Sequence, residues 1–152
     1  MASSNLPYTF GIAENHQDLK AILDLQKANL EVNISEQELK EQGFVTVHHS
    51  LGLLQEMNAS APQIVAKDEN EVVAYALAML ASFRDQIPVL VPMFEMIEKL
   101  EYKGAPISDF SYFIMGQVAN TIRLRKMQSV YIYNTLYLLV VGTFTKKVLI
   151  FK

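Results

Sequence analysis

The longest uninterrupted apolar run in the chain, Val72 to Ala81, most constrains what the chain can fold into. Side chains of a strand point alternately to the two faces of its sheet, so a strand with one wet face alternates apolar and polar residues. A run that is apolar at every position is typical of a strand at the centre of a sheet, covered on both faces. A second apolar run, Gln63 to Lys67, precedes it across the polar turn 68–71, and together they predict an antiparallel hairpin.

Further elements on both sides of this hairpin predict a mixed fold. Strands are expected at 8–13, 110–118, 129–141 and 143–151, where apolar, aromatic and β-branched residues gather. For 129–141, periodicity alone leaves a buried helix open. Helices are expected after the N-cap Asn15, from a capping box at 35–38 to Gly43, within 49–57, and across 92–100 with Gly104 ending the last one. We therefore expect one α/β (α+β) domain over residues 1–152, a mainly antiparallel sheet flanked by helices.

Charge is distributed unevenly along the chain, although the net charge is only −3. Residues 1–119 hold all 16 acidic residues and seven of the 13 basic ones, whereas residues 120–152 hold six basic residues and no acidic one. Such asymmetry is typical of a basic arm that meets an anion. It is equally typical of a segment whose origin differs from that of the rest of the chain.

Several classes of protein are disfavoured by composition. The chain has no cysteine, which excludes disulfides, thiolate zinc sites and cysteine nucleophiles. Residues 1–7 carry no basic and apolar leader, so a cytoplasmic protein is expected. The apolar run 130–141 is too short for a bilayer, which requires about 20 residues. Adjacent His48 and His49 do not have the spacing of zinc ligands, so we expect no metal site and expect both histidines to be at the surface or partly buried.

Six segments within residues 8–119 carry a family resemblance. They are LEVNIS at 30–35, QGFVT at 42–46, IVAKD at 64–68, VAYAL at 73–77, FRDQIPVL at 83–90 and YFIMGQV at 112–118. In order and wording they resemble a bacterial branch of the GNAT-family N-acetyltransferases. The resemblance implies transfer of an acetyl group from acetyl-CoA, as cosubstrate, to an amine. The acceptor would be a small-molecule amine or a protein N-terminus.

The resemblance also implies where the cosubstrate would bind. In that family the strand matching 110–118 splays from its neighbour and pairs with the pantetheine arm, which transfers to Gly116, Gln117, Val118 and Ala119. A glycine-rich loop opening a helix should follow and hold the diphosphate. Residues 120–129 read NTIRLRKMQS instead, without a glycine. Arg123, Arg125 and Lys126 remain as point charges for the phosphates, or as a solvated basic turn.

The tail, residues 120–152, departs from the family in composition and length. The C-terminal half of a GNAT fold is expected to be incomplete, and a shifted reading frame or a fusion would explain both departures. An alternative function follows: a catalytically inactive, truncated GNAT-like module that acts as a binding or dimerisation unit. An apolar edge in the tail predicts a homodimer. No nucleic acid or membrane partner is expected, and Tyr131, Tyr133 and Tyr137 are expected to pack against the sheet.

Methionines and other apolar residues recur at helical spacing in the segment 93–100. Met93, Met96, Ile97 and Leu100 fall at i, i+3, i+4 and i+7. Together with Phe94 they would line an acceptor pocket, as the corresponding insertion does in the family, or they would form a core or dimer-facing side of a helix. Both interpretations stay open. The sequence names no catalytic acid or base.

Overall fold

A five-stranded sheet organises the computed structural model, which describes residues 7–30, 35–36, 47–121, 134–139 and 148–151. The strand order is β1-β2-β3-β6-β7, and each neighbouring pair is antiparallel except β6 and β7, which are parallel. These strands are β1 Tyr8–Ile12, β2 Ile64–Asp68, β3 Glu71–Leu80, β6 Tyr112–Asn120 and β7 Val148–Phe151. The predicted mixed, mainly antiparallel α+β fold is confirmed.

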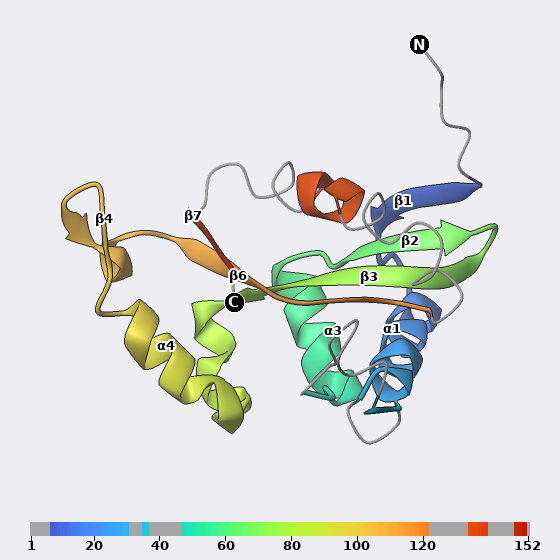
Figure 1. The fold of residues 1–152 in the computed structure, drawn as a ribbon, viewed down its shortest axis with the longest axis horizontal. Coiled ribbons are helices and arrows are strands. Elements are labelled where there is room, and N and C mark those ends of the chain that lie inside the picture. Colours follow the sequence, from blue (N-terminus) through green and yellow to red (C-terminus); the bar gives the residue numbers. More distant parts are fainter. Residues whose placement is uncertain (1–6, 31–34, 37–46, 122–133, 140–147, 152) are drawn as a thin grey trace, which may run out of the picture.

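Helices cover both faces of this sheet (Figure 1). Helices α1 (His16–Ala28) and α3 (Leu51–Ser60) pack on one face, and a helical turn at residues 134–139 packs on the other. At one end of the sheet lie α4, the small sheet and three short 3₁₀ helices. Their bounds are α4 Val91–Ile97, β4 Glu101–Tyr102, β5 Ala105–Pro106, η2 Ala81–Gln86, η3 Pro88–Leu90 and η4 Ile107–Asp109.

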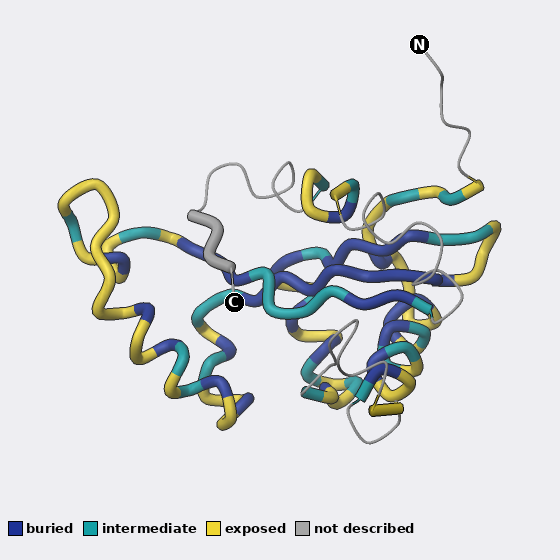
Figure 2. Tube along the Cα trace, in the orientation of Figure 1, coloured by how far each residue is buried: buried dark blue, intermediate teal, exposed yellow. Residues whose placement is uncertain are grey.

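Strand β3 is the centre of the core, as its uninterrupted apolar sequence predicts. Its residues 72–79 are all buried, and Figure 2 shows the strand dark blue along most of its length. Ala74, Ala76 and Ala78 belong to the apolar cluster that includes Leu136 on one side of the sheet. Tyr75 and the other large side chains of β3 pack toward the opposite side, against the helices.

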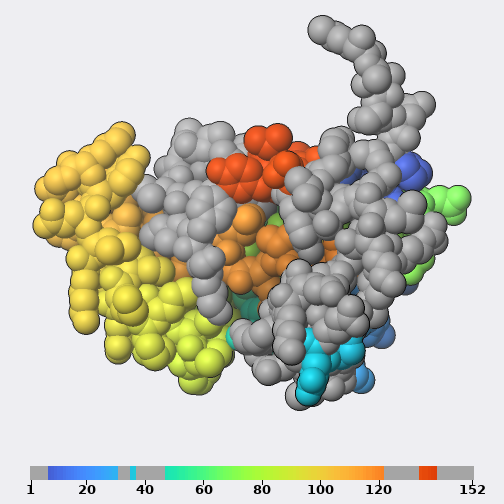
Figure 3. All heavy atoms as spheres, viewed as in Figure 1, coloured from blue at the N-terminus to red at the C-terminus, as the bar shows by residue number. Residues whose placement is uncertain are grey.

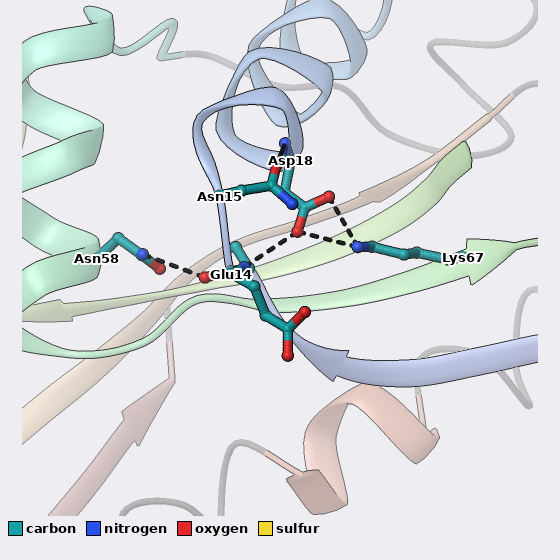
Figure 4. A network of polar contacts seen from close by, with 6 residues as sticks. Glu14, Asn15, Asp18, Asn58 and Lys67 are labelled. Carbon is teal, nitrogen blue, oxygen red and sulfur yellow. Dashed lines mark hydrogen bonds and ion pairs between the residues drawn. The ribbon is translucent and has the colours of Figure 1, made fainter. Parts of the chain in front are cut away.

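The start of α1 is held by its predicted cap and by a charge pair (Figure 4). Asn15 Oδ1 accepts a hydrogen bond from the Asp18 N–H at 2.9 Å, which satisfies one free donor of the first turn. Asp18 is itself buried, accepts from the Glu14 N–H at 3.0 Å, and lies 2.8 Å from Lys67 Nζ on β2. These contacts fix the junction of β1 and α1 onto the sheet.

Gly104 does not end a helix, contrary to the prediction. Helix α4 ends at Ile97, and Gly104 lies in the turn of the β4–β5 hairpin. Lys103 and Gly104 have φ values of 51° and 78°, both in the left-handed region. Two such residues in succession form the tight turn that matches strand twist, so the glycine is used for a hairpin.

The strand predicted at 129–141 is wrong for its described part, because residues 134–139 are helical. Leu136 is fully buried and Leu139 packs beside it, so the helical spacing i, i+3 directs both toward the sheet. A short apolar run is compatible with both a strand and a buried helix, and the helical alternative is the one that forms over 134–139. The strand predicted at 143–151 is confirmed over Val148–Phe151. Most of the helix predicted from the capping box lies beyond the described ranges.

Candidate functional site

On its β7 side, strand β6 is paired for only part of its length among the described residues. Strand β3 pairs with it from Phe113 to Asn120, whereas β7 pairs only with Tyr112–Met115. Among the described residues, no strand lies on the β7 side of residues 116–120. Atoms of β6 show at the surface below residues 134–139 in Figure 3, where β6 is orange and residues 134–139 are red. Within the described residues, residues 116–120 of β6 therefore have no strand partner on the side away from β3, and we call this part of β6 the open edge.

A β-bulge marks the point where this edge opens. Leu77 of β3 faces Gln117, and the next residue, Ala78, faces Met115, so Gly116 has no opposite residue on β3. An extra residue bends its strand and increases the local twist. A Cβ added at Gly116 would meet no atom within 4 Å, so the bulge is not crowded. The bulge thus lies just where the pairing of β6 with β7 ends.

Beyond the bulge, the backbone N–H and C=O groups of every second residue face the open edge. The Thr121 N–H donates to the Val73 carbonyl at 2.8 Å, so Thr121 points toward β3. Because backbone direction alternates along an antiparallel pair, Val118 and Asn120 point away from β3. Asn29 Nδ2 donates to the Asn120 carbonyl at 3.2 Å. The N–H and C=O of Val118 are therefore the pair presented at the edge.

The side chain of Gln117, next to the bulge, is the centre of a buried polar cluster. Its Oε1 accepts from Gln26 Nε2 and from the Tyr75 hydroxyl, both at 2.8 Å. Its Nε2 donates to the Val47 carbonyl at 2.9 Å. Gln26 and Tyr75 are fully buried, so this cluster lies inside the core between α1, β3 and β6. We call Gln26, His49, Tyr75 and Gln117 the Gln117 cluster.

His49 joins the Gln117 cluster as a neutral acceptor. Gln26 Oε1 accepts from the His49 N–H at 3.0 Å, and Gln26 Nε2 lies 2.9 Å from His49 Nδ1. An amide nitrogen is only a donor, so Nδ1 accepts and the ring proton is on Nε2. Burial, and then the neighbouring charge of His48, lower the pKa of His49 from 6.5 to about 4. The Nδ1 lone pair is thus occupied and unsuited to general-base chemistry.

Asn120 ends the open edge with a buried amide. Its side chain is fully buried, and neither Nδ2 nor Oδ1 has a hydrogen-bond partner in the described part of the chain. An unsatisfied buried amide costs about 1–3 kcal/mol of stability. The backbone carbonyl of Asn120 accepts a hydrogen bond from Asn29 Nδ2, which also donates to the Leu25 carbonyl at 2.7 Å.

The predicted site residues are brought together only in part. Residues Gly116, Gln117, Val118 and Ala119 lie in succession on β6, along the open edge. Arg123, Arg125 and Lys126 fall outside the residues that the structure describes, as do Tyr131 and Tyr133. The side chains of Gln26, His49 and Tyr75 were not anticipated as partners of Gln117. A polar residue at a core position of the α1 pattern, Gln26, was the signal for this cluster.

The helix rich in methionine separates into a buried and an exposed side. Phe94 and Ile97 are buried in a core cluster under the end of the sheet, whereas Met96 is 70% exposed and Leu100, which follows the end of α4, is 52% exposed. The core interpretation therefore holds for Phe94 and Ile97. Glu98 is paired with Arg84.

Within the described ranges, no group of three or more His, Asp or Glu side chains could hold a metal ion. No helix there is long and apolar enough to cross a membrane. No family model matches the chain, and no curated protein sequence matches it.

Proposed function

We propose that this protein is an acetyl-CoA-dependent N-acetyltransferase of the GNAT type, acting in the cytoplasm on a small-molecule amine or a protein N-terminus. The observation that carries the proposal is the open edge of β6 beyond its bulge at Gly116. The strand order of residues 8–120 and the resemblance of residues 8–119 support the same assignment.

An open strand edge suits the pantetheine arm of acetyl-CoA. That arm is an extended chain with two amide groups, and an extended chain binds a sheet edge through main-chain hydrogen bonds. The Val118 N–H and C=O face the side from which such a chain would pair. The thioester would then lie toward the bulge, at Gly116 and Gln117.

Transfer at this edge needs a polarised thioester and a neutral amine. Backbone N–H groups directed at the thioester oxygen stabilise the negative charge that develops there during attack. The amine nitrogen forms a bond to the acetyl carbon, the C–S bond breaks, and the coenzyme leaves as a thiolate. The amine gives up one proton to water, and the thiolate takes one from water.

A second candidate is a catalytically inactive GNAT-like module that acts as a binding or dimerisation unit. It is favoured by the absence of glycine between Gly116 and Gly142, because side chains keep a diphosphate away from backbone N–H groups. Arg123, Arg125 and Lys126 would hold the phosphates as point charges, and such binding weakens as salt is raised.

Isothermal titration with acetyl-CoA, and with coenzyme A as a control ligand, separates the two candidates. An acetyltransferase is expected to bind both with a stoichiometry of one per chain, more weakly at high salt. The variant Val118→Pro removes the N–H at the open edge, where proline is tolerated, and is expected to lose binding. Val118→Ala keeps the N–H and is expected to bind. No heat with either ligand would reject the acetyltransferase, and light scattering would then test for a dimer.

A further inference from the structure

We infer that the Gln117 cluster is a positioning device for acyl transfer: it holds the bulge of β6 against the segment 47–50, so that the backbone beside the thioester keeps one geometry. This inference rests on the proposed acetyltransferase function. The side chains of Gln26, His49, Tyr75 and Gln117 would act through the backbone of the bulge and touch no reacting atom.

The cluster connects parts of the chain that are distant in sequence. Gln117 follows the bulged Gly116 directly and bonds to α1 through Gln26, to β3 through Tyr75, and to the segment 47–50 through the Val47 carbonyl, at 2.8, 2.8 and 2.9 Å. Gln26 adds two bonds to His49 in the same segment. One side chain of β6 therefore fixes the segment 47–50 beside the open edge.

Use of three of the four hydrogens of the two amides makes this geometry specific. Gln26 Nε2 uses both hydrogens, toward His49 Nδ1 and Gln117 Oε1, and its Oε1 accepts from the His49 N–H. Gln117 Oε1 accepts twice and its Nε2 donates once. Apolar side chains of similar volume often stabilise a core as well as buried polar groups do. A buried polar network whose members bond to one another adds rigidity and favours a single arrangement of the core.

A rigid arrangement matters at this place because catalysis is sensitive to small displacements. A misplacement of about 1 Å in a transfer site lowers the rate about 100-fold. Loss of the bond to Val47 would remove the direct link between β6 and the segment 47–50, leaving the links through Gln26, and would let the bulge shift. Binding of the pantetheine arm farther along the edge, at Val118, would be affected less. The expected signature is therefore a fall in rate with little change in affinity.

The variant Gln117→Glu tests this inference, because it keeps the size of the side chain and replaces the donor to Val47 by an acceptor. Hydrolysis of acetyl-CoA, with water in place of the amine, is followed by thiol release, and a chain without cysteine gives no background. We expect the rate to fall about 100-fold while the Kd for acetyl-CoA changes less than about threefold. The exposed Gln55→Glu on α3 is the matched control and is expected to leave both unchanged.

A second variant and a spectroscopic signal keep the test decisive if Gln117→Glu does not fold. Tyr75→Phe removes the hydrogen bond from the tyrosine hydroxyl to Gln117 and is expected to lower the rate about tenfold. In both variants the ¹³C shift of the bound acetyl carbonyl should move toward its value in water, which a general loss of stability would not cause. If the folded variants had the same rates and carbonyl shifts as the wild type, the inference would be overturned. Absence of binding by the wild type would instead reject the proposed function, and the inference with it.

Discussion

Protonation of His49 provides a direct test of the Gln117 cluster in the folded chain. Gln26 Nε2 donates to His49 Nδ1, so a proton on Nδ1 would place two donors against each other. Folding therefore disfavours the charged imidazole. The pKa of His49 is about 4 in the folded chain against 6.5 in the unfolded chain, because of burial and of the nearby His48 charge.

The sign and size of the effect follow from proton linkage. Between pH 6.5 and 4 the unfolded chain binds more protons than the folded chain at this site, so stability falls as the pH is lowered. The contribution is fully present above pH 6.5 and is lost by the time the pH reaches about 4. The two pKa values correspond to a loss of about 2 kcal/mol at pH 5 and about 3 kcal/mol in total.

The variant His49→Asn isolates this contribution. Its amide oxygen can accept from Gln26 Nε2 and does not titrate, while His16, His48 and the carboxylates remain. Urea unfolding followed by circular dichroism gives the free energy of unfolding of both proteins at pH 8 and pH 5. We expect the wild type to lose about 2 kcal/mol more than the variant over this range. Equal losses in the two proteins would show that His49 is not held as a neutral acceptor.

Two further predictions concern stability. Asp18→Asn removes the charge that pairs with Lys67 and should lower the free energy of unfolding by about 2 kcal/mol. The control Asp24→Asn, at an exposed position of the same helix, should change it by less than about 0.5 kcal/mol. Equal effects of the two variants in urea unfolding would contradict the role of the pair. Leu136→Ala should cost about 2–5 kcal/mol, because the side chain is fully buried against the sheet. Leu138→Ala, at a position 65% exposed, is its control, and a matching melting temperature for both variants would place Leu136 outside the core.

Local sequence patterns predicted most of the sheet, because the runs of apolar residues in its strands indicate burial. The run at 72–81 identified the central strand, and the polar turn after 64–68 identified its hairpin partner. The bounds of β6 differ from the prediction by two residues at each end. The order of the other strands was not predicted, since periodicity does not specify which strands are neighbours.

The helix at 134–139 and the Gln117 cluster were beyond this kind of reasoning for different reasons. An apolar run in the tail is compatible with either secondary structure, and contact with the alanine face of β3 decides between them. The cluster depends on four residues, 26, 49, 75 and 117, that are far apart in sequence. Only tertiary structure brings their donors and acceptors together.

The two faces of β3 should tolerate opposite kinds of sequence change during evolution. Toward Leu136 the strand presents Ala74, Ala76 and Ala78, where the space is already filled by a neighbouring helix, so added methylenes would force layers apart. Toward α1 and α3 it presents Tyr75 and Leu77, where removal of atoms would leave a void. Related sequences are therefore expected to keep small residues at positions 74, 76 and 78 and large residues at positions 75 and 77 of the same strand.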